Sequence, residues 1–362
     1  VMPVVALRGL VTALSALVIT LNGLYGNGAS TTPPVTGIFG PVATSTVPSI
    51  TAPAVTFPTP SLSTPKPTTS SALALFPNAP SANLALALTS LKNASVNIMC
   101  VSKVQGIRSM SGSGVIFDSR GLILTNSHIA QYYLLESSFP KGSISCTVRT
   151  GSPAQSAYKA KLAYLSSQWL AANPYTLTAT MPRGTGEHDF AVLVITESAT
   201  PFTLPTSFPA MALAKNDVKT GDGIAIASYA AQSLTAEDVR NNLYPTLVFG
   251  SVASRYNFTR GSSADLLSLG GSAAAQEGSS GAGVANEKGE LVGIVTTSSQ
   301  TGPLLMRDLR AVTVSHIRKS FTADSGEDFD SYFKYSTPSD MIAVFIDDVA
   351  TEGSFLRGSI GL

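Results

Sequence analysis

Hydrophobic and polar residues alternate in short runs along most of the chain after residue 84. In residues 94–101, for example, Val96, Ile98 and Cys100 occupy every second position, which is the period of a half-buried strand. Turns rich in Gly, Asn or Ser separate these runs. The expected strands cover residues 94–101, 112–117, 122–125, 143–151, 159–165, 190–195, 222–229, 246–256, 289–298 and 309–317.

Helical patterns are few, and strands do not alternate regularly with helices. Residues 82–93 predict a short helix before the first strand, and a single helical turn is expected after Thr125. Many short strands with little helix predict an all-β fold of barrels or sandwiches. A proline-rich joint near residue 205 divides it into two similar halves, residues 84–199 and 200–321.

Residues 1–29 are predicted to be a signal peptide or a membrane anchor. Arg8 is the only charge before Lys66, and residues 9–25 are almost continuously apolar, a pattern typical of an export signal. The apolar run of ~17 residues is close to the lower limit for crossing a bilayer. Cleavage and anchoring are therefore both left open, and a buried core helix is the alternative.

Residues 30–83 are predicted to be a disordered linker rich in Pro, Ser and Thr. Of the 22 prolines in the chain, 11 fall within residues 30–81. Proline removes backbone donors and excludes regular helix, so we expect an extended, mobile tether.

The amino-acid composition limits which classes of molecule the chain is expected to bind. Charged residues make up 12% of the chain and the net charge is +1, which argues against an electrostatic nucleic-acid partner. Low charge with abundant Ser, Thr and Ala favours an exported, extracytoplasmic protein that is secreted or membrane-anchored. The cysteines and histidines show no zinc-binding spacing, so no metal or other cofactor is expected.

A turn rich in small residues precedes the strand at 289–298. Residues 275–289 read AQEGSSGAGVANEKG, and their small side chains leave room around a serine. A flexible linker is the alternative, although linkers do not usually lead directly into an ordered strand. A serine here could be a nucleophile if a histidine and a carboxylate lie beside it.

Only three histidines in the chain could serve as the base for this serine, His128, His188 and His316. His128 is favoured by its context, a strand, a turn and a second strand that ends just before it. His188 is most simply a solvated or edge residue. His316 lies in a stretch of helical character.

Three blocks carry this chemistry in order, SGSGVIFDSRGLILTNSHIA, HDFAVLVI and EGSSGAGVANEKGELVGIV. They resemble the signature blocks of trypsin-like, chymotrypsin-fold serine proteases, nearest in style to the bacterial HtrA/Deg branch. The spacing also agrees, with 61 residues from His128 to Asp189 and 91 from Asp189 to Ser280. The resemblance covers residues 94 to 320.

The resemblance implies two six-stranded antiparallel β-barrels with the active site between them, in a serine endopeptidase that acts on proteins or peptides. Ser280 would be the nucleophile and His128 its general base, with Asp189 holding the imidazole. The backbone amides of Gly278 and Ser280 would form the oxyanion hole. Glu187 and Asp118 are weaker candidates for the third member of the triad.

The chain departs from the family pattern around the serine. Ser279 stands where digestive members carry Asp and the HtrA branch usually carries Asn, so activation through an ion pair with a new N-terminus is not expected. Ala282 replaces the second glycine after the serine, and Gly283 stands where proline is frequent. Both are tolerable replacements by small residues.

The alignment also implies a primary specificity pocket. Ala274 would lie at its base, and Thr296, Thr297 and Ser298 along one wall. No acidic residue marks the base, so we expect small or medium apolar P1 side chains rather than Lys or Arg.

Cys100 and Cys146 fall on neighbouring expected strands, with 45 residues between them. A disulfide is one interpretation and two buried thiols the other. The 41 residues after Phe321 are too few for the PDZ domain of HtrA proteins, so the regulation and trimeric cage of that branch are not expected. This tail, residues 322–362, is interpreted either as a helix on the barrel or as a frayed end.

Two other classes of function compete with a protease. A catalytically inactive protease-like binding module on the cell surface would keep the fold, although it would have no reason to retain all three triad residues. A surface or adhesion protein would depend mainly on its tether. Reaction with a fluorophosphonate separates the protease from both.

Overall fold

The computed structural model describes residues 80–179, 184–258, 261, 263–298, 302–359 and 361. The predicted signal peptide or anchor at 1–29 lies outside the described residues, as does the predicted linker apart from its last four positions. In the part of the chain that is described, no helix is long and apolar enough to cross a membrane.

The first half of the fold is a closed six-stranded antiparallel barrel with strand order β1-β2-β3-β6-β5-β4. Pairing of β1 with β4 closes the barrel. Its strands are β1 (Ser95–Ser102), β2 (Met110–Asp118), β3 (Leu122–Thr125), β4 (Ile144–Thr150), β5 (Gln155–Leu165) and β6 (Ala191–Ser198).

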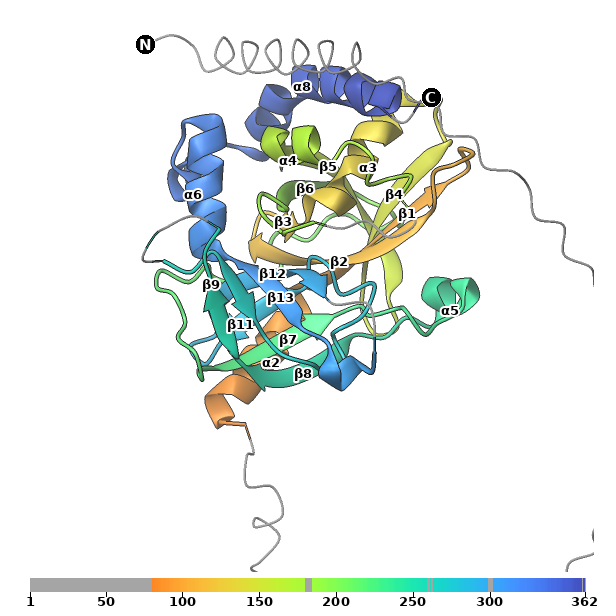
Figure 1. Cartoon of the computed structure of the whole chain (residues 1–362). Coiled ribbons are helices and arrows are strands. Elements are labelled where there is room, and N and C mark those ends of the chain that lie inside the picture. The colour runs from red at the N-terminus through yellow and green to blue at the C-terminus, as the bar shows by residue number, and fades with distance from the viewer. Residues whose placement is uncertain are drawn as a thin grey trace, which may run out of the picture. The chain divides into compact units, whose positions relative to one another are not determined.

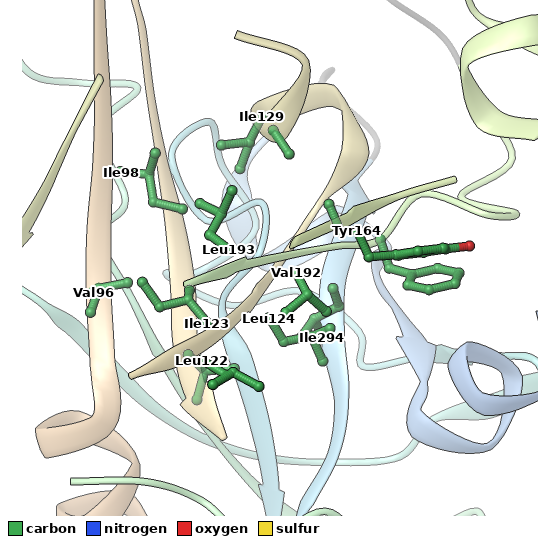
Figure 2. Packing of buried hydrophobic residues seen from close by; sticks show 14 of the residues in the cluster. Val96, Ile98, Leu122, Ile123, Leu124, Ile129, Tyr164, Val192, Leu193 and Ile294 are labelled. Carbon is green, nitrogen blue, oxygen red and sulfur yellow. The ribbon is translucent and has the colours of Figure 1, made fainter. Parts of the chain in front are cut away.

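Apolar side chains fill this barrel at the positions that the alternation predicts. Figure 2 shows Val96 and Ile98 of β1 facing Ile123 of β3 and Leu193 of β6, and all four side chains are fully buried. Burying a side chain of this size contributes about 1.5–3 kcal/mol. The barrel is therefore a rigid frame for the loops at its ends.

The second half is a seven-stranded antiparallel sheet with strand order β8-β7-β11-β12-β13-β10-β9. Its strands are β7 (Gly223–Ser228), β8 (Thr246–Ser251), β9 (Ser254–Tyr256), β10 (Leu266–Ser268), β11 (Gly283–Asn286), β12 (Leu291–Ser298) and β13 (Leu309–Thr313).

The two edge strands of this sheet, β8 and β9, are consecutive in the chain and separated by only Val252 and Ala253. The Val252 amide donates to Asp222 O beside β7 at 3.0 Å, and the Ala253 amide donates to Ser268 O of β10 at 2.8 Å. One bent segment thus supplies both edge strands, and the sheet is curved like part of a barrel. The expected single strand at 246–256 is split by this bend, which explains seven strands where six were predicted. The all-β, chymotrypsin-like fold class is confirmed.

Helix α2 (Ala82–Ala94) packs beneath the second sheet and contacts β7 and β11 (Figure 1). The Ser81 hydroxyl caps its first turn by accepting from the Leu84 amide at 3.2 Å. Leu84, Leu88 and Leu91 form a buried stripe with helical spacing. The remaining short helices are α4 (Ser167–Ala172), α5 (Ala236–Asn241), η1 (Leu304–Met306), α6 (Val314–Ser325) and α7 (Phe329–Tyr335).

Helix α3 (Ser127–Ser138) is longer than the single helical turn expected after Thr125. Residues 129–135 are all buried, and this apolar surface sustains the helix over three turns. Its buried partner is α8 (Pro338–Ser359), which packs against α3 at the top of Figure 1.

The tail is thus a helix packed on the barrel, one of the two interpretations that the sequence left open. Met341, Phe345 and Leu356 of α8 are buried. Arg357 donates to Ser138 O at 2.6 Å, at the end of α3. The C-terminal helix therefore holds the helix on which His128 lies.

Cys100 of β1 and Cys146 of β4 are directly opposite each other in the ladder that closes the barrel. Their sulfur atoms are joined in a disulfide. The bond lies next to α3, since the Cys146 amide donates to Glu136 of that helix at 3.4 Å.

Candidate active site

His128 is the second residue of α3, immediately after the end of β3. Its side chain is 26% exposed, and its Nδ1 atom lies 2.8 Å from Asp189 Oδ2. The His128 amide also donates to Asp189 Oδ1 at 3.1 Å. Both oxygens of one carboxylate therefore hold the same histidine, once through its ring and once through its backbone.

Asp189 is almost fully buried, 5% exposed, at the entrance to β6. In addition to the two contacts with His128, its Oδ2 accepts from the Thr296 hydroxyl at 2.8 Å. The two oxygens of this buried carboxylate thus have three hydrogen-bond partners, the His128 amide, the His128 ring and the Thr296 hydroxyl. Because Nδ1 faces this carboxylate, the imidazole proton belongs on Nδ1, and Nε2 is left as the acceptor.

The backbone around Asp189 is fixed by residues at the start of α3. Asn126 Nδ2 donates to Asp189 O at 2.8 Å, and the Ser127 hydroxyl donates to Phe190 O at 2.7 Å. His188 adopts a left-handed conformation with φ of 58°, which non-glycine residues rarely adopt. The His128 and Asp189 segments are thus bound to each other by backbone as well as side chain.

His188, Glu187 and Asp118 are engaged elsewhere. His188 Nδ1 lies 2.5 Å from the Ser320 hydroxyl of α6, and its Nε2 lies 3.7 Å from Glu187 Oε1. Asp118 forms an ion pair with Arg120 at 2.7 Å. Asp189 is therefore the carboxylate that the structure brings to His128.

Ser280 lies on the turn before β11, against the end of the first barrel. Its carbonyl accepts from the Ser113 amide of β2 at 2.7 Å. Ser113 O in turn accepts from the Thr125 hydroxyl at 2.8 Å, three residues before His128. Within the described residues, no hydrogen bond joins the Ser280 hydroxyl to His128.

The turn directs two backbone amides away from the protein's own acceptors. Glu277 O accepts from the Ala231 amide at 2.8 Å, and Ser279 O accepts from the Ala282 amide at 2.9 Å. In a trans peptide the N–H points opposite to the C=O, so the Gly278 and Ser280 N–H groups face the other way. Neither amide has a hydrogen-bond partner in the described part of the chain.

Glycine is required at two positions of this turn. Gly278 has φ of +91°, and a Cβ there would lie 2.5 Å from Tyr229 O. Gly281 has φ of +81°, and a Cβ there would overlap the carbonyl oxygen of Ser113. The small residues of this stretch thus permit left-handed backbone and a close approach to two other segments.

Ser279 points into the protein, where it is fully buried and donates to the Ser228 hydroxyl at 3.1 Å. A neutral hydroxyl pair thus occupies the place where the family resemblance implied an acidic or amide side chain. Ala282 and Gly283 are also buried, and a Cβ on Gly283 would lie 2.7 Å from Leu91 of α2.

The residues predicted for the specificity pocket lie on the loop before β11 and on β12. Ala274 is fully buried in an apolar cluster with Ala275 and Leu309. The Thr296 hydroxyl donates to Asp189 Oδ2 at 2.8 Å. Thr297 and Ser298 continue β12, where they pair with Arg310 and Leu309.

Sequence reasoning missed a nearly buried guanidinium behind the serine turn. Arg307, 9% exposed, donates to Gly302 O at 3.0 Å, to Gln232 Oε1 at 2.7 Å and to Ala275 O at 2.9 Å. It joins three separate segments, and no acidic partner accompanies it among the residues described. The planar guanidinium, with five N–H donors in a fixed geometry, is suited to bind acceptors that lie in different directions.

No group of three or more His, Cys, Asp or Glu residues in the described chain could hold a metal ion. The described site contains the His128–Asp189 pair, the serine turn and two amides that have no hydrogen-bond partner among the described residues.

Comparison with known proteins gives a matching family model and similar solved structures. A family model for the trypsin-like peptidase domain matches residues 112–294, just over half of the 362 residues. The crystal structure of the serine endoprotease from Yersinia pestis is 20% identical, with a TM-score of 0.42. The match covers 67% of this chain and 66% of that chain. No curated protein matches the chain.

Proposed function

The chain belongs to the family of trypsin-like peptidases, which are serine endopeptidases, and we propose that His128, Asp189 and Ser280 are its catalytic triad. The observation that carries this proposal is the 2.8 Å contact between His128 Nδ1 and the buried Asp189 carboxylate. That contact leaves Nε2 of a partly exposed imidazole free to accept a proton.

In the proposed reaction, Ser280 Oγ attacks the carbonyl carbon of the peptide bond while its proton passes to His128 Nε2. Asp189 stabilises the imidazolium that forms. The same proton then passes to the leaving amine, and the acyl group stays on Ser280. A water molecule, deprotonated by His128, releases the acyl group in the second half of the reaction.

The Gly278 and Ser280 amides serve as the oxyanion hole. Both lack a partner among the described residues, and their peptide planes are held by bonds from Ala231 and Ala282. Donors fixed in advance stabilise the developing negative charge without reorganising during the reaction. Each such donor is worth about 10²–10³-fold in turnover.

The direct test is hydrolysis of a peptide library by the purified chain and two serine variants. Ser280→Ala should lower kcat by about 10⁶-fold, as loss of the nucleophile does in other serine proteases. Ser279→Ala is the matched control, because it removes the neighbouring hydroxyl, and should cost less than about tenfold. Comparable losses in the two variants would refute the assignment, and activity retained by Ser280→Ala would refute it outright.

For the substrate, we propose proteins or peptides with a small or medium apolar P1 residue. The residue proposed for the pocket base, Ala274, is buried among apolar side chains and carries no charge to bind Lys or Arg. Profiling with a mixture of peptides tests this, since preferred cleavage after Lys or Arg would contradict it.

For the location, we propose an extracytoplasmic protein, secreted or held at a membrane by residues 1–29. The Cys100–Cys146 disulfide supports an oxidising compartment. Cell fractionation with mass spectrometry of the N-terminus tests both points. A cytosolic chain with free thiols would contradict the proposal.

An inactive binding module is the alternative outcome of these experiments. It would be supported if the folded chain bound peptides but neither cleaved them nor reacted at Ser280.

A further inference from the structure

Ser113 of β2 lies at the junction between the first barrel and the serine turn. Its side chain is fully buried, 0% exposed. The hydroxyl accepts from the Tyr229 amide at 2.9 Å and donates to Gly278 O at 2.7 Å. One hydroxyl thus joins three segments that are far apart in the sequence.

The backbone of Ser113 holds the other side of the same turn. Its amide donates to Ser280 O at 2.7 Å, so Ser113 binds the carbonyls on both sides of Ser279. Its own carbonyl accepts from the Thr125 hydroxyl at 2.8 Å. The amide, the carbonyl and the hydroxyl of Ser113 are therefore all hydrogen-bonded, and they connect the serine turn to the strand that leads to His128.

The two segments that the hydroxyl joins are those that orient the Glu277–Gly278 peptide. Ala231, two residues after Tyr229, donates to Glu277 O at 2.8 Å. If the segment from Tyr229 to Ala231 moves relative to Gly278, that peptide loses its anchor and is free to rotate. Rotation would replace the Gly278 N–H by the Glu277 carbonyl, which would repel an oxyanion.

We propose that the Ser113 hydroxyl is a positioning residue for catalysis, which fixes the Gly278 amide in its donating orientation. The inference rests on the proposed function of the Ser280 turn. Ser113 touches no reacting atom and acts through the two backbone groups that it binds. A buried serine that only satisfied these groups would affect stability and leave the reaction unchanged.

Ser113→Ala tests the inference, because it removes only the hydroxyl and keeps the backbone bonds to Ser280 and Thr125. Ser325→Ala is the matched control. Ser325 is also buried, donates to Phe321 O at 2.7 Å and accepts from the Glu327 amide at 3.1 Å, at the end of α6. Both variants thus lose one buried hydroxyl that bridges two backbone groups.

The assay is the rate at which the full chain reacts with a fluorophosphonate. In this reaction the Ser280 Oγ–P bond forms, the P–F bond breaks, and the hydroxyl proton leaves with fluoride as HF. The phosphoryl oxygen occupies the oxyanion hole, so the rate reports on the Gly278 amide. Ser113→Ala should react about 10²-fold more slowly than the parent chain, and its kcat for a peptide should fall by a similar factor while KM changes less than about threefold.

Thermal unfolding separates a positioning role from a structural one. Both variants should unfold at similar temperatures, and Ser325→Ala should react at the parental rate. A folded Ser113→Ala variant with the parental rate would overturn the inference. If that variant does not fold, Ser113→Cys, which keeps a weak donor in the same shape, should react at an intermediate rate, and a parental rate there would also overturn the inference.

Failure of the proposed function gives a different result. In that case the parent chain itself would not react with the fluorophosphonate at Ser280, and no comparison among the variants would be needed.

Discussion

Replacing Asp189 by Asn separates the charge of the carboxylate from its shape. Asn is nearly isosteric, so the buried site keeps its volume. Its NH₂ group must stand where one of the two oxygens was. At the Oδ1 position it would face the His128 amide, a backbone donor that cannot reverse. At the Oδ2 position it faces the His128 ring and the Thr296 hydroxyl, both of which can become acceptors.

The hydrogen-bond pattern therefore selects the second orientation. The NH₂ group of the substituted side chain then donates to His128 Nδ1, which forces the imidazole proton onto Nε2. An Nε2 that carries a proton cannot accept one from Ser280. The wrong tautomer costs about 10⁴-fold in kcat, which corresponds to about 5.5 kcal/mol in the activation free energy.

The assay is steady-state hydrolysis of a peptide by the parent chain, Asp189→Asn and Thr296→Val. Thr296→Val removes one donor to the carboxylate but leaves the Nδ1 tautomer intact, so we expect a loss of less than about tenfold. Circular dichroism and thermal unfolding show whether each variant is folded. A folded Asp189→Asn variant within tenfold of the parent rate would refute the reasoning on the tautomer.

Three further predictions concern the rest of the fold. Burial lowers the pKa of His316, despite hydrogen bonding to Asp265, so the unfolded chain binds this proton at a higher pH than the folded chain. The stability that the neutral, buried His316 provides is complete above about pH 6.5 and is lost as the pH falls. His316→Gln should therefore make the urea midpoint of unfolding fall less between about pH 7 and 5. Arg307→Met leaves three hydrogen-bond acceptors without a donor and should lower kcat/KM by about 10–100-fold. Arg307→Lys should not restore kcat/KM. Parental kinetics in Arg307→Met would show that the hydrogen bonds of Arg307 do not support the site. Reduction of the Cys100–Cys146 disulfide by an added thiol reductant should increase the mass by two hydrogen atoms and lower the free energy of unfolding by about 3–4 kcal/mol in a chain-entropy model. An unchanged mass would mean that the two thiols were already free.

Sequence patterns were sufficient for the family, the fold class and the enzyme class, all of which are confirmed. Long apolar runs, such as those of β6 and β12, predicted strands because such a run can be recognised in the local sequence without knowledge of distant contacts. The blocks around His128, Asp189 and Ser280 pointed to one site because their order and spacing are typical of one fold. The triad itself stays a prediction until kinetics test it.

The sequence did not predict features that depend on contacts between residues far apart in the chain. Strand β10 is three residues long, too short to show a period. The bend at Val252 arises only because one segment pairs with both edges of a sheet. The length of α3 depends on its burial under α8. Nothing in the local sequence shows that Thr296 binds Asp189 or that Ser113 binds Gly278, since these partners are 107 and 165 residues away in the chain.

The central claim is that His128 activates Ser280 as the nucleophile. The most direct measurement is peptide mapping by mass spectrometry after reaction with a fluorophosphonate, for the parent chain and His128→Ala. We predict one adduct, on Ser280, that forms at least about 10³-fold more slowly in His128→Ala. An adduct on Ser279 or on a different residue, or equal rates in the two chains, would contradict the claim.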